Sequence, residues 1–174
     1  MRNSRLENRR SDSFQMTNLK ELRRRLEVQG FTGLTDQDLR ELGPWMRFTP
    51  VLNTTLAAIG TFFASPQLLL LFAFLMGIGA VFPAHPFDLL YNNAMRFLTH
   101  TKPFPRSGAR RRFVFGIECW WSLITAWMFS AGHLSWGFSM GWALTIMAFM
   151  LASANICVIS ELLHKIFGTP GMRE

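Results

Sequence analysis

The stretch LSWGFSMGWALTIMAFMLASANICV, residues 134–158, contains no charged side chain. A helix of about 20 apolar residues crosses the ~30 Å hydrocarbon core of a bilayer, so this stretch predicts a transmembrane helix. Three further apolar runs precede it, at residues 45–64, 67–82 and 113–131. They lack the alternation of barrel strands, and lipid cannot satisfy open backbone groups. The sequence therefore predicts an all-α integral membrane protein built as a four-helix bundle.

The Lys and Arg residues, which number 18 and leave a net charge of +7, are distributed unevenly. Ten lie in residues 1–47, six in 83–112 and two after residue 158, whereas the tight connections at 65–66 and 132–133 hold none. By the positive-inside rule, the basic segments lie in the cytoplasm. Both termini are therefore predicted to be cytoplasmic, and the basic surface is expected to face anionic lipid headgroups.

Residues 1–44 are predicted to form a basic cytoplasmic arm, of which residues 1–16 show no apolar period. Two capping-box patterns, at 18–21 and 35–38, predict two short helices in the arm. The first helix carries a basic cluster that is expected to face headgroups or a partner protein. A nucleic-acid partner is not predicted, because no aromatic side chains for base stacking are interleaved with the cluster. The cluster is Lys20, Arg23, Arg24 and Arg25.

Residues 86–99 carry apolar side chains at helical spacing, with Asp88, Asn92 and Arg96 on the opposite face. The stretch is too short to cross a bilayer. It is therefore predicted to lie in the cytoplasmic interface between spans two and three, with its apolar side towards lipid. A basic triplet that precedes span three is expected to contact lipid or a partner, and it consists of Arg110, Arg111 and Arg112.

The fourth run has a face of small residues at intervals of three and four. Such a face lets helix backbones approach closely in lipid. It is expected to pack inside the bundle, with a homodimer contact as the alternative. Its main members are Gly137, Gly141, Ala148 and Ala152. The last residues, 166–174, are expected to form a short tail.

A layer of polar residues is predicted near the cytoplasmic surface of spans one, three and four, and Asn53 and Thr54 are its members in span one. Ionisable groups at membrane depth usually face a bundle interior, so Glu118 is the first candidate for a functional residue. Glu161 and His164 have the one-turn spacing of di-metal carboxylate bundles, although such bundles need a second motif. The alternative is that Glu161 pairs with Lys165 and that Glu118 pairs with Arg47 or another basic group. The metal or redox candidates are Glu118, Cys119, Cys157, Glu161 and His164.

Recognised catalytic patterns are absent from the sequence. It contains no Gly-rich phosphate loop, no Ser-His-Asp order and no zinc-knuckle spacing. The sequence therefore predicts no cofactor, although bound lipids are expected.

Two stretches, HPFDLLY at 85–91 and NICVISEL at 155–162, resemble a bacterial four-span membrane protein family of unknown function. The resemblance covers approximately residues 45–165 and implies one transmembrane domain in the bacterial cytoplasmic (inner) membrane. In that family the second stretch often reads Cys-x-x-Cys followed by Glu. Here Ser160 occupies the second cysteine position, which weakens a thiol–disulfide interpretation because both sulfurs are needed.

Two classes of function follow from these patterns. The leading hypothesis is a non-catalytic accessory or structural subunit of a larger membrane complex, docking through the arm, the interfacial helix and the small-residue face. The alternative is a membrane redox or metal-binding protein that uses the Cys, Glu and His candidates. A small oligomeric transporter ranks last, because the outer half of the runs offers few polar residues.

Overall fold

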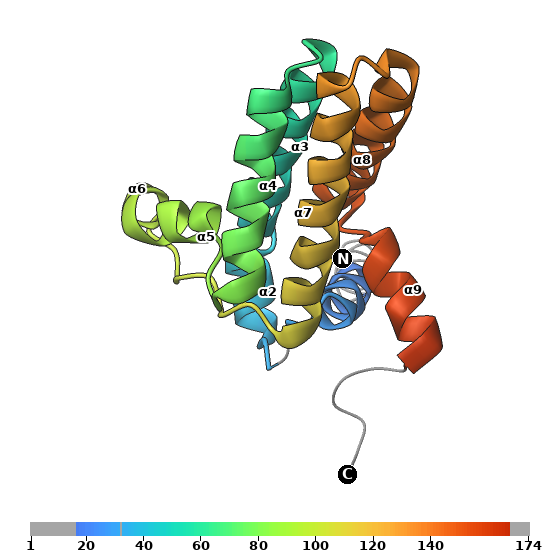
Figure 1. The fold of residues 1–174 in the computed structure, drawn as a ribbon. Helices are drawn as coiled ribbons and strands as arrows, with labels where there is room; N and C mark the ends of the chain where they lie inside the picture. The colour runs from blue at the N-terminus through green and yellow to red at the C-terminus, as the bar shows by residue number, and fades with distance from the viewer. Residues whose placement is uncertain (1–16, 32, 168–174) are drawn as a thin grey trace, which may run out of the picture.

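A computed structural model describes residues 17–31 and 33–167, and within these residues the chain is helical without strands. Helix α4 packs along α7 and α3 packs along α8, while contacts of α3 with α4 and of α7 with α8 close the ring. The all-α fold is therefore confirmed for the described residues. The four helices, which stand side by side in Figure 1, are α3 (Phe48–Phe62), α4 (Pro66–Val81), α7 (Ala109–Ser130) and α8 (Leu134–Ala154).

Two of these helices meet the length and hydropathy expected of a membrane span. Helices α7 and α8 do so individually, whereas α4 does so only together with the helical residues 86–99, from which it is bent by 81°. Helix α3 has 15 residues, fewer than the ~17 of a typical span, although the 3-10 turn η1 (Trp45–Arg47) extends it. The structure thus supports two or three of the four predicted spans.

Residues 86–99 form three short helical pieces that project sideways from the bundle (Figure 1). They are α5 (Pro86–Leu90), one π turn called η2 (Tyr91–Met95) and α6 (Arg96–Thr99). The expectation that Asp88 lies on an exposed polar face, opposite an apolar side towards lipid, is wrong, because Asp88 is only 2% exposed. Asn92 likewise turns inward, where its Oδ1 accepts a hydrogen bond from the backbone N–H of Phe104 at 2.7 Å.

The fourth predicted span ends earlier than expected. Helix α8 stops at Ala154, Asn155 adopts the left-handed conformation with φ 52°, and a separate helix, α9 (Val158–Phe167), follows. Asn tolerates this conformation and commonly ends helices. Two arm side chains occupy the break: Arg25 donates to the carbonyl oxygen of Ala154 at 2.6 Å, and Gln29 donates to that of Asn155 at 2.8 Å.

The arm packs against the base of the bundle. Residues 17–28 are helical, and α2 (Asp36–Leu42) begins with the predicted capping box between Thr35 and Asp38. Residues 1–16 of the predicted arm and 168–174 of the predicted tail lie outside the described residues. A hydrophobic core joins the arm to the loop before α7, and its buried members include Leu26, Leu39, Leu42, Tyr91 and Phe104.

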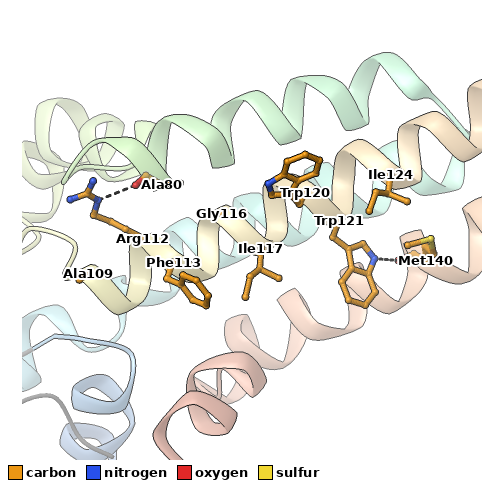
Figure 2. A pocket seen from close by; sticks show the side chains of 10 residues that line it. All are labelled: Ala80, Ala109, Arg112, Phe113, Gly116, Ile117, Trp120, Trp121, Ile124 and Met140. Carbon is orange, nitrogen blue, oxygen red and sulfur yellow. Dashed lines mark hydrogen bonds between the residues drawn. The ribbon is translucent and has the colours of Figure 1, made fainter. Parts of the chain in front are cut away.

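Most of the basic residues predicted to contact lipid or a partner also contact their own chain. Arg112 donates from Nε to the carbonyl oxygen of Ala80 at 3.0 Å (Figure 2) and from Nη2 to that of Val81 at 2.6 Å. Cations at a helix C-terminus are stabilising because the exposed carbonyls carry partial negative charge. Arg110 similarly donates to the carbonyl oxygen of Val28. The arm's arginines form ion pairs, Arg23 with Asp36 and both Arg24 and Arg25 with Glu21. Lys20 is exposed.

The small-residue face of α8 lies inside the bundle. Gly137, Gly141, Ala148 and Ala152 are all buried. A Cβ atom at Gly141 would lie 2.5 Å from Oγ1 of Thr61 on α3, so only glycine allows this approach of the two helices. In this structure the face packs inside the bundle, and the homodimer contact and the docking role of the face stay predictions.

This packing predicts opposite effects for two Gly→Ala substitutions. Gly141→Ala forces Thr61 to move, which is expected to cost about 1–3 kcal/mol of folding free energy. Gly116→Ala serves as the control, because its Cβ would lie 3.9 Å from the nearest atom, and alanine is favoured over glycine in helices by about 0.5–1 kcal/mol. Thermal unfolding in detergent measures both changes. Equal destabilisation by the two substitutions would contradict the close α3–α8 contact.

Candidate functional site

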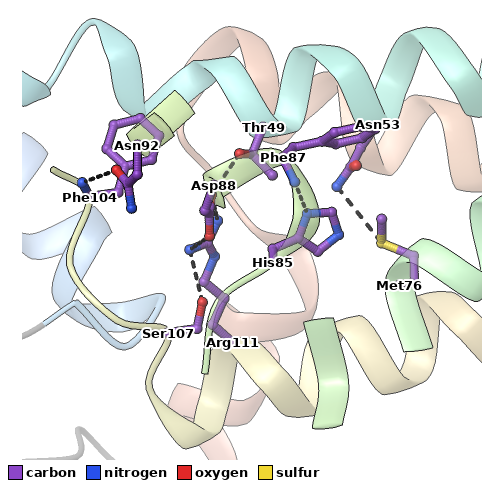
Figure 3. Close-up of polar contacts among 10 residues, drawn as sticks. All are labelled: Thr49, Asn53, Met76, His85, Phe87, Asp88, Asn92, Phe104, Ser107 and Arg111. Atoms are coloured by element: carbon purple, nitrogen blue, oxygen red, sulfur yellow. Dashed lines mark hydrogen bonds and ion pairs between the residues drawn. The ribbon is translucent and has the colours of Figure 1, made fainter. Parts of the chain in front are cut away.

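A buried ion pair lies at the base of the bundle, between residues 86–99 and α7 (Figure 3). Arg111 donates from Nη1 to Oδ2 of Asp88 at 2.8 Å and from Nη2 to Oδ1 at 3.1 Å, a bidentate arrangement. Thr49 on α3 donates to the same carboxylate at 2.6 Å, and Arg111 also donates to Oγ of Ser107 at 3.0 Å. Three elements therefore meet at one carboxylate, and both charges are paired and hydrogen-bonded.

The residues before Asp88 position its carboxylate. His85 is the N-cap of α5, where its Nδ1 accepts a hydrogen bond from the backbone N–H of Phe87 at 3.2 Å. Pro86 occupies the first helical position, which suits its fixed φ and missing N–H. Asp88 then falls in the first turn, where the partial positive charge of the helix N-terminus favours a carboxylate.

His85 is fully buried and only partly hydrogen-bonded. Its ring lies 4.6 Å from that of Phe115, and its Nε2 has no hydrogen-bond partner among the described residues. Gly79 makes the space for this ring, because a Cβ there would collide with it. Burial lowers the pKa of His85 to about 4, an effect that Asp88 opposes and Arg111 reinforces. The imidazole is therefore neutral at pH 7.

A second group of polar side chains surrounds a small cavity of about 30 Å³ between α3, α7 and the break after α8. This volume corresponds to a single water molecule. Asn53 donates from Nδ2 to Sδ of Met76 at 3.8 Å, while its Oδ1 is buried without a partner in the described part of the chain. The cavity is lined by polar residues from four segments, among them Gln29, Asn53, Arg111, Glu118, Cys157 and Ser160.

The structure brings together two of the five predicted metal or redox candidates. Glu118 and Cys157 line this cavity. Burial raises the pKa of the Cys157 thiol, an effect that a hydrogen bond with Ser160 opposes, so the thiol stays protonated at neutral pH. Cys119 lies elsewhere, in an apolar groove between α7 and α4 beside Gly77. The two thiols therefore line different cavities.

The other two candidates lie on α9. Glu161 is partly exposed, and its charge acts on Arg24 of the arm. His164 lies in the same helix, and its side chain is outside the described structure. Within the described residues, no three His, Cys, Asp or Glu groups are arranged to hold a metal ion. Among the described residues, Glu118 forms no ion pair with Arg47, and Glu161 forms none with Lys165.

The sequence interpretation missed the ion pair because it assigned Asp88 to a solvent-facing side and Arg111 to a docking surface. A usable signal was present. Asp88 is the sole carboxylate between residues 45 and 117, and it follows the cap pattern His85-Pro86. An isolated acid among apolar segments requires a cationic partner, and the nearby basic triplet supplies one.

The described residues define a class: helical proteins with two to three candidate membrane spans and a buried polar layer at one end of the bundle. The family model described as a domain of unknown function (DUF4395) matches residues 44–165, and the chain belongs to this family. Neither the curated proteins nor the solved structures contained a match to the chain. The match agrees with the uncharacterised family expected over residues 45–165. The four-span architecture of the chain stays a prediction.

The buried ion pair predicts a strong effect of removing one charge. Asp88→Asn leaves Arg111 buried without an anion, which is expected to destabilise the fold by about 3–5 kcal/mol. Asp36→Asn is the matched control, because Asp36 forms an exposed ion pair with Arg23 and its loss should change stability little. Unfolding in detergent followed by circular dichroism measures both. A small, equal effect of the two substitutions would contradict the structural role of Asp88.

The buried histidine predicts a loss of stability in mild acid. The unfolded chain takes up a proton near pH 6.5, whereas His85 in the folded state does so only near pH 4. Between these values the unfolded state binds more protons, so stability falls as pH falls through this window. His85→Asn keeps a capping acceptor and is expected to flatten the part of the pH profile that His85 contributes. His133→Asn, at an exposed position, is expected to leave the thermal-unfolding profile unchanged.

Proposed function

We propose that the chain is a four-span protein of the bacterial cytoplasmic membrane and a non-catalytic accessory subunit of a larger membrane complex. Residues 86–99 carry this proposal, because they present an apolar surface outside the bundle. On their inner side Asp88 and Tyr91 are buried. On their outer side four large apolar side chains are 45–76% exposed, namely Leu89, Leu90, Phe97 and Leu98.

The positions of the charged residues support the proposed topology. Apart from Arg96 on the laterally projecting α6, the described basic residues belong to segments at the end of the bundle that carries the arm and α9, and the two short turns at the opposite end hold none. Excess positive charge marks the cytoplasmic side of membrane proteins. With η1 included, the helical path of the first span covers residues 45–62, which brings it to the lower end of the spanning length.

The size of the polar cavity supports a non-catalytic role. A site for a small-molecule substrate usually has a volume of about 300–1,000 Å³. The cavity beside Glu118 has about 30 Å³, room for a water molecule and no more. Larger grooves occur on the outer surface of α7, and their linings are mainly apolar. These surfaces suit contact with lipid or protein better than chemistry.

The alternative proposal, a membrane redox or metal-binding protein, has one supporting observation: Cys157 and Glu118 line the same cavity. Position 160, which often holds a second cysteine in the family that the chain resembles, lines this cavity too. Here it is Ser160, and Cys119 lies in a different groove, so a pair of thiols is not assembled. The geometry therefore supports the accessory role better.

The accessory role predicts protein contacts at residues 86–99. A photo-crosslinking amino acid at Leu98, which is 76% exposed, is expected to give a discrete protein adduct in native membranes. The control position is Leu134, which is 53% exposed at the opposite end of the bundle and is expected to give none. Gel migration after irradiation and mild-detergent extraction measures the adducts. Migration as an unlinked monomer, or adducts with lipid alone at Leu98, would overturn the proposal.

A further inference from the structure

A groove of about 790 Å³ runs along the outer face of α7, with Ala80 of α4 and Met140 of α8 at its sides. Figure 2 shows Arg112 at one end of the groove and Ile124 at the other. Gly116 lies between these ends, where a Cβ would meet only the methyl group of Ala80 at 3.9 Å. The absence of a side chain there leaves this part of the groove open.

The lining of the groove is apolar except at its basic end. Its large side chains are Phe113, Ile117, Trp120, Trp121 and Ile124. Trp120 is 70% exposed, whereas the Trp121 indole is fixed by donating to the carbonyl oxygen of Met140 at 3.0 Å. An aromatic residue with one side open to the bilayer provides contact area for a hydrocarbon chain.

Arg112 retains its positive charge at the end of the groove. Its hydrogen bonds go to the carbonyl oxygens of Ala80 and Val81, which orient the guanidinium without neutralising it. None of the ion pairs in the described residues involves Arg112. A guanidinium has five N–H donors, and the two in use leave others for an anionic oxygen. The charge is therefore available to a phosphate group.

The length of the groove fits one leaflet of a bilayer. Twelve residues separate Arg112 from Ile124, which in a helix corresponds to about 18 Å. Half of the ~30 Å hydrocarbon core is about 15 Å. A membrane-spanning partner helix would need about twice this length, whereas one acyl chain with its headgroup at Arg112 matches it.

We propose that this groove is a binding site for an anionic phospholipid, whose phosphate contacts Arg112 and whose acyl chain lies along Phe113, Ile117 and Trp120. The proposal rests on the proposed membrane placement and is independent of the accessory role. Because Arg112 lies at the basic end of the bundle, the lipid comes from the cytoplasmic leaflet. Its recognition is electrostatic at the headgroup and apolar along the chain.

Native mass spectrometry of the detergent-purified protein tests the site. Phosphatidylglycerol is expected to bind about five- to tenfold more tightly than phosphatidylcholine with the same acyl chains, because a basic residue near an anionic headgroup contributes about that factor. Arg112→Gln keeps a donor for the α4 carbonyls and is expected to abolish the preference. Equal binding of the two lipids by the unchanged protein, or a preference that survives Arg112→Gln, overturns the proposal.

A matched pair of glycine substitutions tests the groove independently of the charge. Gly116→Leu fills the proposed groove and is expected to weaken binding of the first phosphatidylglycerol several-fold. Gly77→Leu fills the separate groove beside Cys119 and is expected to leave that binding unchanged. Equal weakening by both substitutions, or displacement of the lipid by glycerol phosphate, overturns the proposal. Extraction of the protein without detergent would instead refute the membrane placement itself.

Discussion

The bidentate ion pair between Asp88 and Arg111 is the constraint on which the base of this bundle depends. An isolated charge is costly to bury, so each of these two groups requires the other. The Asp88 carboxylate also accepts a hydrogen bond from Thr49, so α3, α7 and residues 86–99 are joined at one point. The guanidinium of Arg111 lies 4.8 Å above the ring of Phe31, which attaches the arm to the same point.

Several features follow from this junction. Helix α4 ends at Val81 and the chain bends by 81° before α5, an arrangement that brings Asp88 to Arg111. The apolar outer side of residues 86–99 is consequently held in a fixed direction. The arm is held as well, since Arg25 and Gln29 bind the carbonyl oxygens at the end of α8. Cationic side chains at this end thus stabilise helix ends by donating hydrogen bonds to the terminal carbonyl oxygens.

Hydrophobic length and capping patterns allowed much of the fold to be predicted from the sequence. These signals are local, and they located the long helices, the turn at Ser65 and the capping box at Thr35. The end of α8 at Ala154 could not be predicted in this way. The apolar run continues past Asn155, and the break depends on Arg25 and Gln29, which are distant in the sequence.

The candidate site was less predictable because it depends on which way side chains point. The spacing of residues in spans one, three and four predicted that Asn53, Glu118 and Cys157 lie at a similar depth, and they line one cavity. The same reasoning placed Cys119 beside Glu118. Adjacent residues on a helix point about 100° apart, because 3.6 residues complete a turn, so Cys119 faces α4 instead. Depth follows from sequence position, whereas direction follows from the packing of neighbouring helices.

The same rotation separates the roles of two adjacent arginines. Arg111 points into the bundle, where Asp88 neutralises it and its side chain is 13% exposed. Arg112 points towards the end of α4, where carbonyl dipoles hold it in place but leave its formal charge. A carboxylate partner removes a cation from the surface field, whereas carbonyl partners do not. Arg111 therefore belongs to a structural ion pair, whereas the charge of Arg112 remains available to an anionic ligand.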